Sequence, residues 1–194
     1  MAFFISIILA YLIGSLSFAI ILAKLMCFRD PRTTGSGNAG ATNMLRMAGK
    51  QAALYVLLGD ALKGLIAVLI ARFLGVYGVS LACIALVVVI GHVFPLYFKF
   101  RGGKGVATML GAFLGLSFWI GLFLIATWLI IAYLFRYSSV ATLVSAVAAP
   151  ICMMIGGAYV DYFFPVLLMT ILVVWKHWEN IQRLRKGIEG KIQF

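Results

Sequence analysis

Apolar residues fill most of the chain in runs long enough to cross a lipid bilayer. These runs lie at about 3–27, 52–74, 76–98, 105–135, 139–160 and 162–178. A helix that spans the hydrocarbon needs roughly 20 residues. Five runs therefore have the length of one span, whereas the run 105–135 is long for one helix and short for two. The pattern predicts an all-α integral membrane protein.

The positions of Lys and Arg decide how the run 105–135 is divided. Basic residues follow the first span, the third span and the last span. Cytoplasmic loops are rich in Lys and Arg, and a single helix at 105–135 would put the basic C-terminal segment on the opposite side from the others. We therefore expect two short spans with a bend near Gly115 to Ser117. This gives seven transmembrane helices, some short or broken, with the N-terminus outside and the C-terminus cytoplasmic.

Composition supports a membrane protein and excludes several other classes. The chain is 64% hydrophobic with a mean hydropathy of +1.12, and its net charge of +11 is concentrated in short segments between apolar runs. That clustering is typical of cytoplasmic loops and not of a nucleic-acid-binding domain. No soluble domain or repeat is visible, so residues 1–194 form one expected membrane domain. Cys27, Cys83 and Cys152 have no metal-ligand spacing, and we expect neither a metal nor another cofactor.

A polar, glycine-dense segment runs from Thr34 to Arg46, with the sequence T-G-S-G-N-A-G-A-T-N-M-L-R. Its glycines can adopt positive φ and leave backbone N–H groups unshielded, and its short polar side chains add hydrogen-bond donors beside a fixed cation. Such a segment is suited to an oxyanion, above all a phosphate. The residues expected to bind it are Ser36, Gly37, Asn38, Thr42, Asn43 and Arg46.

A second glycine-rich segment, Gly91 to Thr108, ends in R-G-G-K-G-V-A-T. Arg101, Gly102, Gly103 and Gly105 surround Lys104 where the fourth span begins, so backbone amides and an ammonium can converge on one anion. The segment lacks the Walker A pattern, and no nucleotide hydrolysis follows from it. A tight cytoplasmic turn would explain a lone motif of this kind, but two donor-rich segments on the same side favour anion binding.

A third element, Lys176 to Lys191, continues from the last span. On a helix, His177 and Asn180 share a face with Ile181 and Leu184. An interfacial helix anchored by Trp178 explains most of the Lys and Arg residues here. His177 and Asn180 lie where the helix enters the membrane, and we expect them to turn toward the two glycine-rich segments.

Two charged residues, Asp60 and Lys63, lie one turn apart inside the second span. An intramembrane charge pair should face protein and not lipid. Lys63 either belongs to a structural ion pair or takes part in substrate binding, and the sequence leaves both open. His92, near the end of the third span, is expected to position the loop that follows Pro95.

The three elements together resemble one known family. S-G-N-A-G-A-T-N-M-L-R at Ser36 to Arg46, G-H-V-F-P with F-R-G-G-K-G-V-A-T up to Thr108, and N-I-Q-R-L-R-K-G-I-E at Asn180 to Glu189 are similar to the motifs of the bacterial acyl-phosphate:glycerol-3-phosphate acyltransferases, the PlsY family. The resemblance covers nearly the whole chain. It implies transfer of a fatty acyl group from acyl-phosphate to the 1-hydroxyl of sn-glycerol 3-phosphate. The products would be lysophosphatidic acid and phosphate, formed at the cytoplasmic face of the bacterial inner membrane among membrane lipids.

The expected site residues follow from these motifs. Ser36 and Arg46, with their polar neighbours, would hold one phosphate, and Lys104 with the glycine amides would hold another or the developing oxyanion. His177 and Asn180 would orient glycerol 3-phosphate. The proton acceptor is either His177 or a substrate phosphate. No covalent enzyme intermediate is expected, because acyl-phosphate is already activated.

Two other classes remain as alternatives. A transporter of a phosphorylated solute would show paired broken segments in two repeated halves, which this sequence lacks. A membrane scaffold would not need the donor-rich first segment. The proposed site requires Arg46, Lys104 and Asn180 to converge around one cavity in the structure. Oligomeric state and preference for acyl-chain length cannot be predicted from the sequence.

Overall fold

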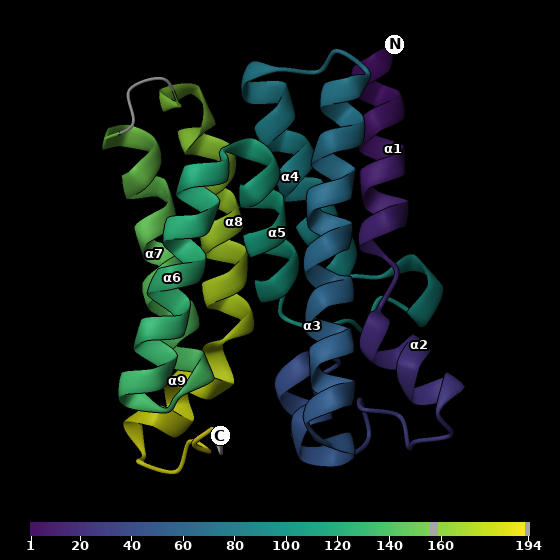
Figure 1. The fold of residues 1–194 in the computed structure, drawn as a ribbon, viewed down its shortest axis with the longest axis vertical. Coiled ribbons are helices and arrows are strands. Elements are labelled where there is room, and N and C mark those ends of the chain that lie inside the picture. The colour runs from purple at the N-terminus through teal and green to yellow at the C-terminus, as the bar shows by residue number, and fades with distance from the viewer. Residues whose placement is uncertain (156–158, 193–194) are drawn as a thin grey trace.

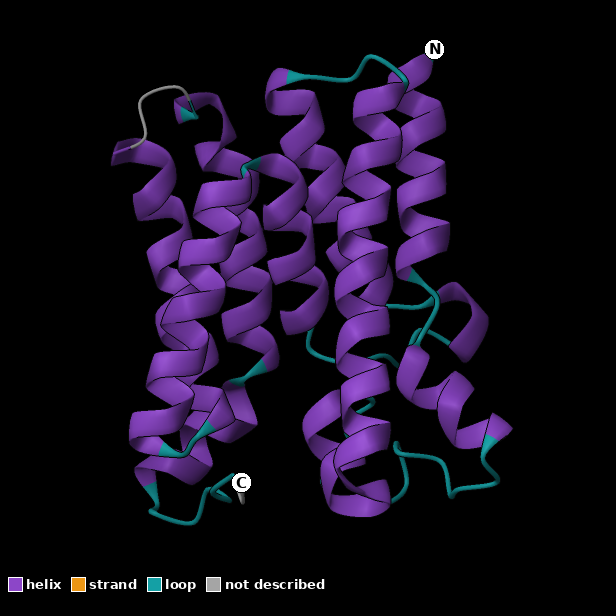
Figure 2. Cartoon of the chain, viewed as in Figure 1, coloured by secondary structure: helices purple, strands orange, loops and turns teal. Residues whose placement is uncertain are grey.

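The computed structural model describes residues 1–155 and 159–192, which form a bundle of helices without strands (Figures 1 and 2). The α-helices are α1 (Ala2–Gly14), α2 (Phe18–Leu25), α3 (Ala41–Phe73), α4 (Gly78–Val93), α5 (Val106–Leu116), α6 (Phe118–Phe135), α7 (Ser138–Ile155), α8 (Phe163–Lys176) and α9 (Trp178–Arg185). Two short 3-10 helices, η1 (Leu96–Phe98) and η2 (Val160–Tyr162), precede α5 and α8. The prediction of an all-helical membrane protein is confirmed.

Helices of membrane-spanning length and composition dominate the bundle. Within the described residues, four helices qualify alone, and up to six spans result if the bent pairs α1–α2 and α8–α9 each count as one. The apolar α5 is shorter, at 11 residues. Counting α5 as well would give the seven expected spans, but this number and the orientation of the termini stay predictions. The two termini do lie at opposite ends of the bundle (Figure 1).

The break expected between Gly115 and Ser117 is present. Helix α5 ends at Leu116, Ser117 adopts an extended conformation, and α6 begins at Phe118. The guanidinium of Arg72 on α3 donates a 2.6 Å hydrogen bond to the Leu116 carbonyl oxygen. This bond satisfies a carbonyl that the end of the helix leaves without an intrahelical partner.

The first apolar run, which has the length of one span, is broken into two helices. Helices α1 and α2 meet at an angle of 43°. At the break, Ser15 Oγ accepts a hydrogen bond from the Leu96 amide at 3.1 Å, and Lys63 Nζ donates to the Leu16 carbonyl oxygen at 2.5 Å. The chain bends here because residues on η1 and α3 bind the Ser15 hydroxyl and the Leu16 carbonyl oxygen, which lie between the two helices.

Two expected boundaries also differ from the structure. The polar segment 34–46 is not all loop, because α3 already begins at Ala41, and the helical turns before Gly49 are separated from the membrane part by a kink with φ of 84° at that glycine. At the other end of the chain, α9 does not continue straight from α8 but bends by 54° at His177. Both departures turn these segments of the chain across the end of the bundle that carries the C-terminus (Figure 1).

Helix α5 lies in close contact with α3 through small residues. A methyl group at Gly64 would collide with the Thr108 carbonyl oxygen, and one at Gly111 with the Ala61 carbonyl oxygen. Backbones approach this closely in membranes where glycine leaves room. The G-x-x-x-G pattern at Gly111 to Gly115 therefore serves contacts within this chain, and these contacts fix where α5, and the loop before it, begin.

Candidate active site

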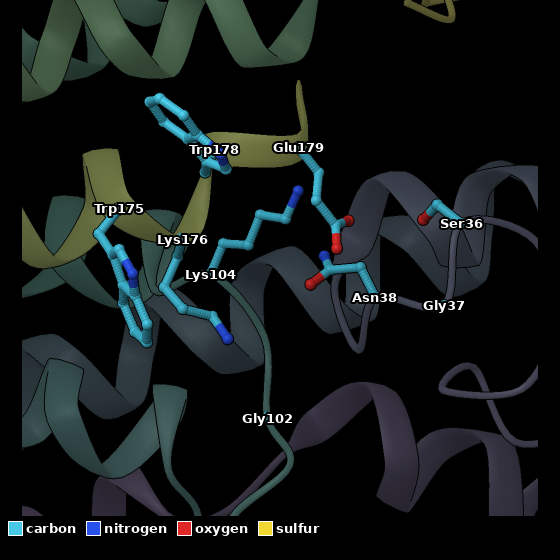
Figure 3. Close-up of a pocket in the computed structure, with 9 residues that line it drawn as sticks. All are labelled: Ser36, Gly37, Asn38, Gly102, Lys104, Trp175, Lys176, Trp178 and Glu179. Atoms are coloured by element: carbon cyan, nitrogen blue, oxygen red, sulfur yellow. The ribbon is translucent and has the colours of Figure 1, made fainter. Parts of the chain in front are cut away.

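One open pocket of about 350 Å³ lies where the three predicted elements meet. Figure 3 shows Lys104 and Lys176 on one side of it and Asn38 and Glu179 on the other. Its lining residues are Ser36, Gly37, Asn38, Gly102, Lys104, Trp175, Lys176, Trp178 and Glu179. The first glycine-rich segment, the loop before α5 and the α8–α9 junction thus form three walls of one cavity.

Lys104 is held at the start of α5 by its neighbours. Gly105 adopts φ of 86° directly before the first turn of the helix, a conformation that favours glycine. The Lys104 ammonium donates a hydrogen bond to Asn180 Oδ1 on α9. Burial, followed by the nearby charge of Arg183, lowers the pKa of Lys104 to about 8. The site therefore favours a negatively charged ligand, because an anion beside Lys104 would stabilise the charged form of its side chain.

Glu189 joins several of the surrounding elements. Its carboxylate accepts hydrogen bonds from Asn180 Nδ2 at 2.6 Å, Arg183 Nε at 2.7 Å and Ser139 Oγ at 2.8 Å. Burial acts to raise the pKa of this carboxyl, but these three hydrogen bonds outweigh it and lower the pKa. The carboxylate therefore stays ionised and fixes Asn180, which in turn contacts Lys104.

Arg46 lies beside the same group of residues. A methyl group built on Gly190 would be 2.9 Å from the Arg46 guanidinium, which places Arg46 next to the residue after Glu189. The structure therefore brings Arg46, Lys104 and Asn180 to one end of the bundle, but of the three only Lys104 lines the pocket itself. Arg46 is exposed and stands outside the innermost lining of the pocket.

Asn43 and Thr42 do not face the pocket. Asn43 is buried, its Nδ2 donates to the carbonyl oxygens of Pro31 at 2.8 Å and Thr34 at 3.0 Å, and its Oδ1 accepts from the Ser36 amide at 2.9 Å. Thr42 Oγ1 lies 3.3 Å from Ser138 Oγ on α7. Asn43 thus shapes the loop that presents Ser36 to the pocket.

A second contact fixes the first loop against the loop before α5. Arg32 binds the Asp30 carboxylate, with Nη2 2.6 Å from Oδ2, and its Nη1 donates to the Phe98 carbonyl oxygen at 3.0 Å. The hydrogen bond from Arg32 lowers the pKa of Asp30. The sequence pattern did not reveal this contact, although the D-P-R spacing allows the Asp30 carboxylate and the Arg32 guanidinium to pair.

His177 is buried at the α8–α9 break beside the pocket. Its Nδ1 lies 2.8 Å from the Val173 carbonyl oxygen. A carbonyl oxygen only accepts, so Nδ1 carries the proton and Nε2 is the acceptor of the neutral ring. Burial is the main cause that lowers the pKa of His177 to about 4. The imidazole is therefore neutral at physiological pH.

The remaining predicted residues divide between the wall and its support. Gly102 lines the pocket, whereas Gly103 is buried beneath it between the His92 ring and the Ala39 carbonyl. Arg101 is exposed and lies outside the lining. Lys63 is buried in the membrane part of α3, bound to Asp60 at 2.8 Å. It therefore does not reach the pocket.

Part of the pocket wall was interpreted differently from sequence. Trp175, Lys176, Trp178 and Glu179 line the cavity, although the pattern suggested an interfacial helix anchored by Trp178. Glu179 pairs with Arg183 at 3.8 Å, but Arg183 lies closer to Glu189, at 2.7 Å. The bend at His177 turns both flanks of that histidine toward the cavity, and the position of these residues beside His177 was the available signal.

Comparison with known proteins places this pocket in a family. The sequence profile described as glycerol-3-phosphate acyltransferase matches residues 4–187. The chain belongs to the glycerol-3-phosphate acyltransferase family. A glycerol-3-phosphate acyltransferase of Coxiella burnetii (strain Dugway 5J108-111) is 74% identical over 193 residues and is covered completely, as is this chain.

Solved structures of this family support the same assignment. The crystal structure of the integral membrane acyltransferase PlsY in its glycerol 3-phosphate form matches with a TM-score of 0.94 and 38% identity, over 100% of this chain and 96% of that one. The lysophosphatidic acid form of PlsY matches with a TM-score of 0.91 and 36% identity over the same shares. The chain is therefore an integral membrane acyltransferase of the PlsY type.

Proposed function

We propose that this acyltransferase moves a fatty acyl group from acyl-phosphate to the 1-hydroxyl of sn-glycerol 3-phosphate, giving lysophosphatidic acid and phosphate. The observation that carries the proposal is a pocket with two lysines and two donor-rich loops in its wall. Both of these substrates bear a phosphate. The similar PlsY has been solved in glycerol 3-phosphate and lysophosphatidic acid forms, which fits the proposed acceptor and product.

The pocket residues suggest how two phosphates are accommodated. Ser36 and Asn38, with the backbone around Gly37, supply neutral donors on one wall, with Arg46 nearby. Lys104, supported by Asn180, supplies a partly desolvated ammonium on another wall. Charge-assisted hydrogen bonds of this kind are about twice as strong as neutral ones. Lys104 would stabilise the charge that develops when the acyl group is transferred.

The proposed reaction needs only one displacement. The 1-hydroxyl oxygen of glycerol 3-phosphate bonds to the acyl carbon, and the bond from that carbon to the phosphate oxygen breaks, so phosphate leaves with the electron pair. A mixed anhydride is activated enough that orientation and electrostatic stabilisation account for the protein's part. No covalent intermediate on the chain is involved.

The hydroxyl proton passes to a phosphate oxygen in this scheme. A phosphate monoester has a second pKa near 6, whereas that of His177 is lowered to about 4. The phosphate is therefore the stronger base of the two acceptors at neutral pH. His177 instead orients the acceptor substrate, with Nε2 available to a hydroxyl group because Nδ1 is bound to Val173.

The reaction is proposed to take place at the cytoplasmic face of the bacterial inner membrane. The loops between α2 and α3 and between α6 and α7 lie at the same end of the bundle as α9, and the loop between α4 and α5 is set back from that end (Figure 1). Of the 16 Lys and Arg residues, Lys63 lies within the membrane part of α3 and Arg72 at its other end, and the rest lie in or beside these segments. This distribution follows the positive-inside bias.

Purified protein in lipid vesicles tests the donor directly. It would be supplied with glycerol 3-phosphate and either acyl-phosphate, acyl-CoA or acyl carrier protein bearing the same chain, and phosphate and lysophosphatidic acid would be measured. The proposal expects equal amounts of both products from acyl-phosphate, with little transfer from the thioesters. Transfer from a thioester alone would overturn the proposed donor while leaving the family assignment intact.

A further inference from the structure

Three buried polar side chains form a network below the pocket that the proposed reaction does not use. Lys63 Nζ on α3 lies 2.8 Å from Asp60 Oδ1, 2.9 Å from His92 Nδ1 on α4 and 2.5 Å from the Leu16 carbonyl oxygen at the α1–α2 break. Asp60, Lys63 and His92 are each at most 4% exposed. Charged groups this deep in a membrane protein are expensive to bury and commonly mark a functional element.

The hydrogen bond from Lys63 fixes how the His92 ring is used. An ammonium has only donors, so His92 Nδ1 accepts, and the neutral ring carries its proton on Nε2. The Nε2 end lies against Gly103, where an added methyl group would collide with it. One end of the ring is therefore anchored to the buried pair, while the other contacts the backbone next to Lys104.

Gly103 is enclosed from a second side by the first loop. The same added methyl group would lie 2.5 Å from the carbonyl oxygen of Ala39, which follows the pocket residue Asn38. Gly103 thus fills a narrow space between the His92 ring and the first loop. A shift of the His92 ring toward or away from Gly103 would move the backbone that carries Lys104 relative to the wall formed by Ser36 and Asn38.

We propose that His92 is a positioning residue for the acyl transfer. The Asp60–Lys63 pair anchors its ring, and the ring sets the position of Gly103 and hence of the Lys104 ammonium. This inference rests on the proposed role of Lys104 in the pocket. A purely structural network that only joins α3 to α4 is the alternative.

Two amide substitutions at His92 separate the alternatives. In His92→Asn the amide reaches only the position of Nδ1, so it keeps the bond to Lys63 but leaves space below Gly103. In His92→Gln the amide extends to the position of Nε2, so it fills that space but loses the Nδ1 geometry. The measurements are the melting temperature, kcat, and the KM for glycerol 3-phosphate.

Positioning predicts that stability and activity rank the two variants in opposite orders. His92→Asn should be the more stable protein but lose roughly 10- to 100-fold in kcat/KM, as a misplacement of about 1 Å at a reacting group can cause. His92→Gln should melt at a lower temperature yet retain more activity. If activity instead follows melting temperature in both variants, or if His92→Asn has the kinetics of the parent, the positioning role is wrong.

A mutant cycle with two adjacent glycines gives an independent test. A methyl group at Gly103 meets the His92 side chain, whereas one at Gly102 meets the His92 carbonyl oxygen. His92→Ala should therefore reduce the effect of Gly103→Ala. The loss in kcat/KM of the double variant should be about tenfold smaller than the product of the losses of the two single variants. With Gly102→Ala the losses should multiply. Equal behaviour of both pairs would contradict contact through the ring.

Lys104→Met in the same assays distinguishes failure of this inference from failure of the underlying proposal. If Lys104→Met keeps the kinetics of the parent, the proposed role of Lys104 is wrong, whatever the His92 variants do. If Lys104→Met is inactive while the His92 variants show no reversed order and no coupling, only the positioning role fails.

Discussion

The Asn180 side chain donates to the Glu189 carboxylate at 2.6 Å with its nitrogen and accepts from the Lys104 ammonium with its oxygen. An amide has separate donor and acceptor ends, so this arrangement fixes its orientation. Through Asn180 the Glu189 carboxylate holds the Lys104 ammonium at the start of α5. The pocket thus keeps a positively charged wall while its supporting carboxylate is occupied by other partners.

Replacing Glu189 by Gln should weaken the fold most at neutral pH. The pKa of Glu189 is lowered in the fold, so its contribution to stability is present above the unfolded value of about 4.5 and is lost as pH falls through the folded pKa. Glu189→Gln should therefore lower the unfolding free energy by roughly 2 kcal/mol at pH 7. Melting temperatures from pH 3.5 to 7 check this, and a difference from the parent that stays constant below pH 4 would contradict it.

The alkaline side of the pH–rate profile should report Lys104. Its pKa is lowered to about 8, and the ammonium is lost as pH rises through that value. The kcat/KM for glycerol 3-phosphate reports groups of the free enzyme and should fall about tenfold per pH unit above it. Lys104→Arg is the matched control, because a guanidinium stays charged and should remove this descent near pH 8. A descent that persists in Lys104→Arg belongs to another group.

Asn43 and Ser36 should respond differently to truncation although they belong to one motif. Asn43→Ala removes three hydrogen bonds to the loop backbone and should lower stability by about 2 kcal/mol together with activity. The exposed Ser36 lines the pocket, so Ser36→Ala should reduce kcat/KM without lowering the melting temperature. An Asn43→Ala protein that melts like the parent would show that the loop is held by other contacts.

His177 should contribute without titrating in the neutral range. With its pKa lowered to about 4, the imidazole is neutral throughout the range from about pH 5.5 to 7.5. The ratio of kcat/KM between the parent and His177→Gln should therefore stay constant across that range. Comparing the two proteins cancels the titration of the substrate phosphates. A ratio that rises with pH around the ordinary histidine value of 6.5 would restore His177 as the general base.

Methyl groups on two glycines of the bundle should differ in their effect on stability. At Gly111 the new atom would collide with the Ala61 backbone, which can move only if α3 and α5 separate. At Gly59 it would meet the Phe18 ring, which can rotate away. Gly111→Ala should therefore cost at least about 2 kcal/mol more than Gly59→Ala, as overpacking against rigid neighbours does. Similar melting temperatures for both variants would argue against tight α3–α5 packing.

The meeting of Arg46, Lys104 and Asn180 could be expected from sequence for a physical reason. In a chain that is 64% hydrophobic, polar loops can only gather at the ends of the bundle, and the positive-inside bias assigns all three basic segments to one end. The break at Ser117 followed from the same charge argument. These features depend on local composition and on span parity, both of which a single sequence contains.

Other features depend on partners that no local pattern reveals. The bend at Leu16 exists because Lys63 and the Leu96 amide bind the chain there, and neither lies near it in sequence. Asn43 looked like a ligand because it stands among donors, yet its direction is set by the carbonyl oxygens of Pro31 and Thr34. Both outcomes are decided by how loops close in three dimensions.

The shortness of α5 has a consequence for how a fat-soluble and a water-soluble reactant can meet. At 1.5 Å per residue, its 11 residues rise about 16 Å, roughly half of a hydrocarbon core about 30 Å thick. The loop between η1 and α5 therefore lies nearer the middle of the bundle than the loops between α2 and α3 and between α6 and α7 (Figure 1). In the proposed reaction, a water-soluble acceptor would meet the donor at this loop, while the fatty tail of the donor stayed among the acyl chains of its own leaflet.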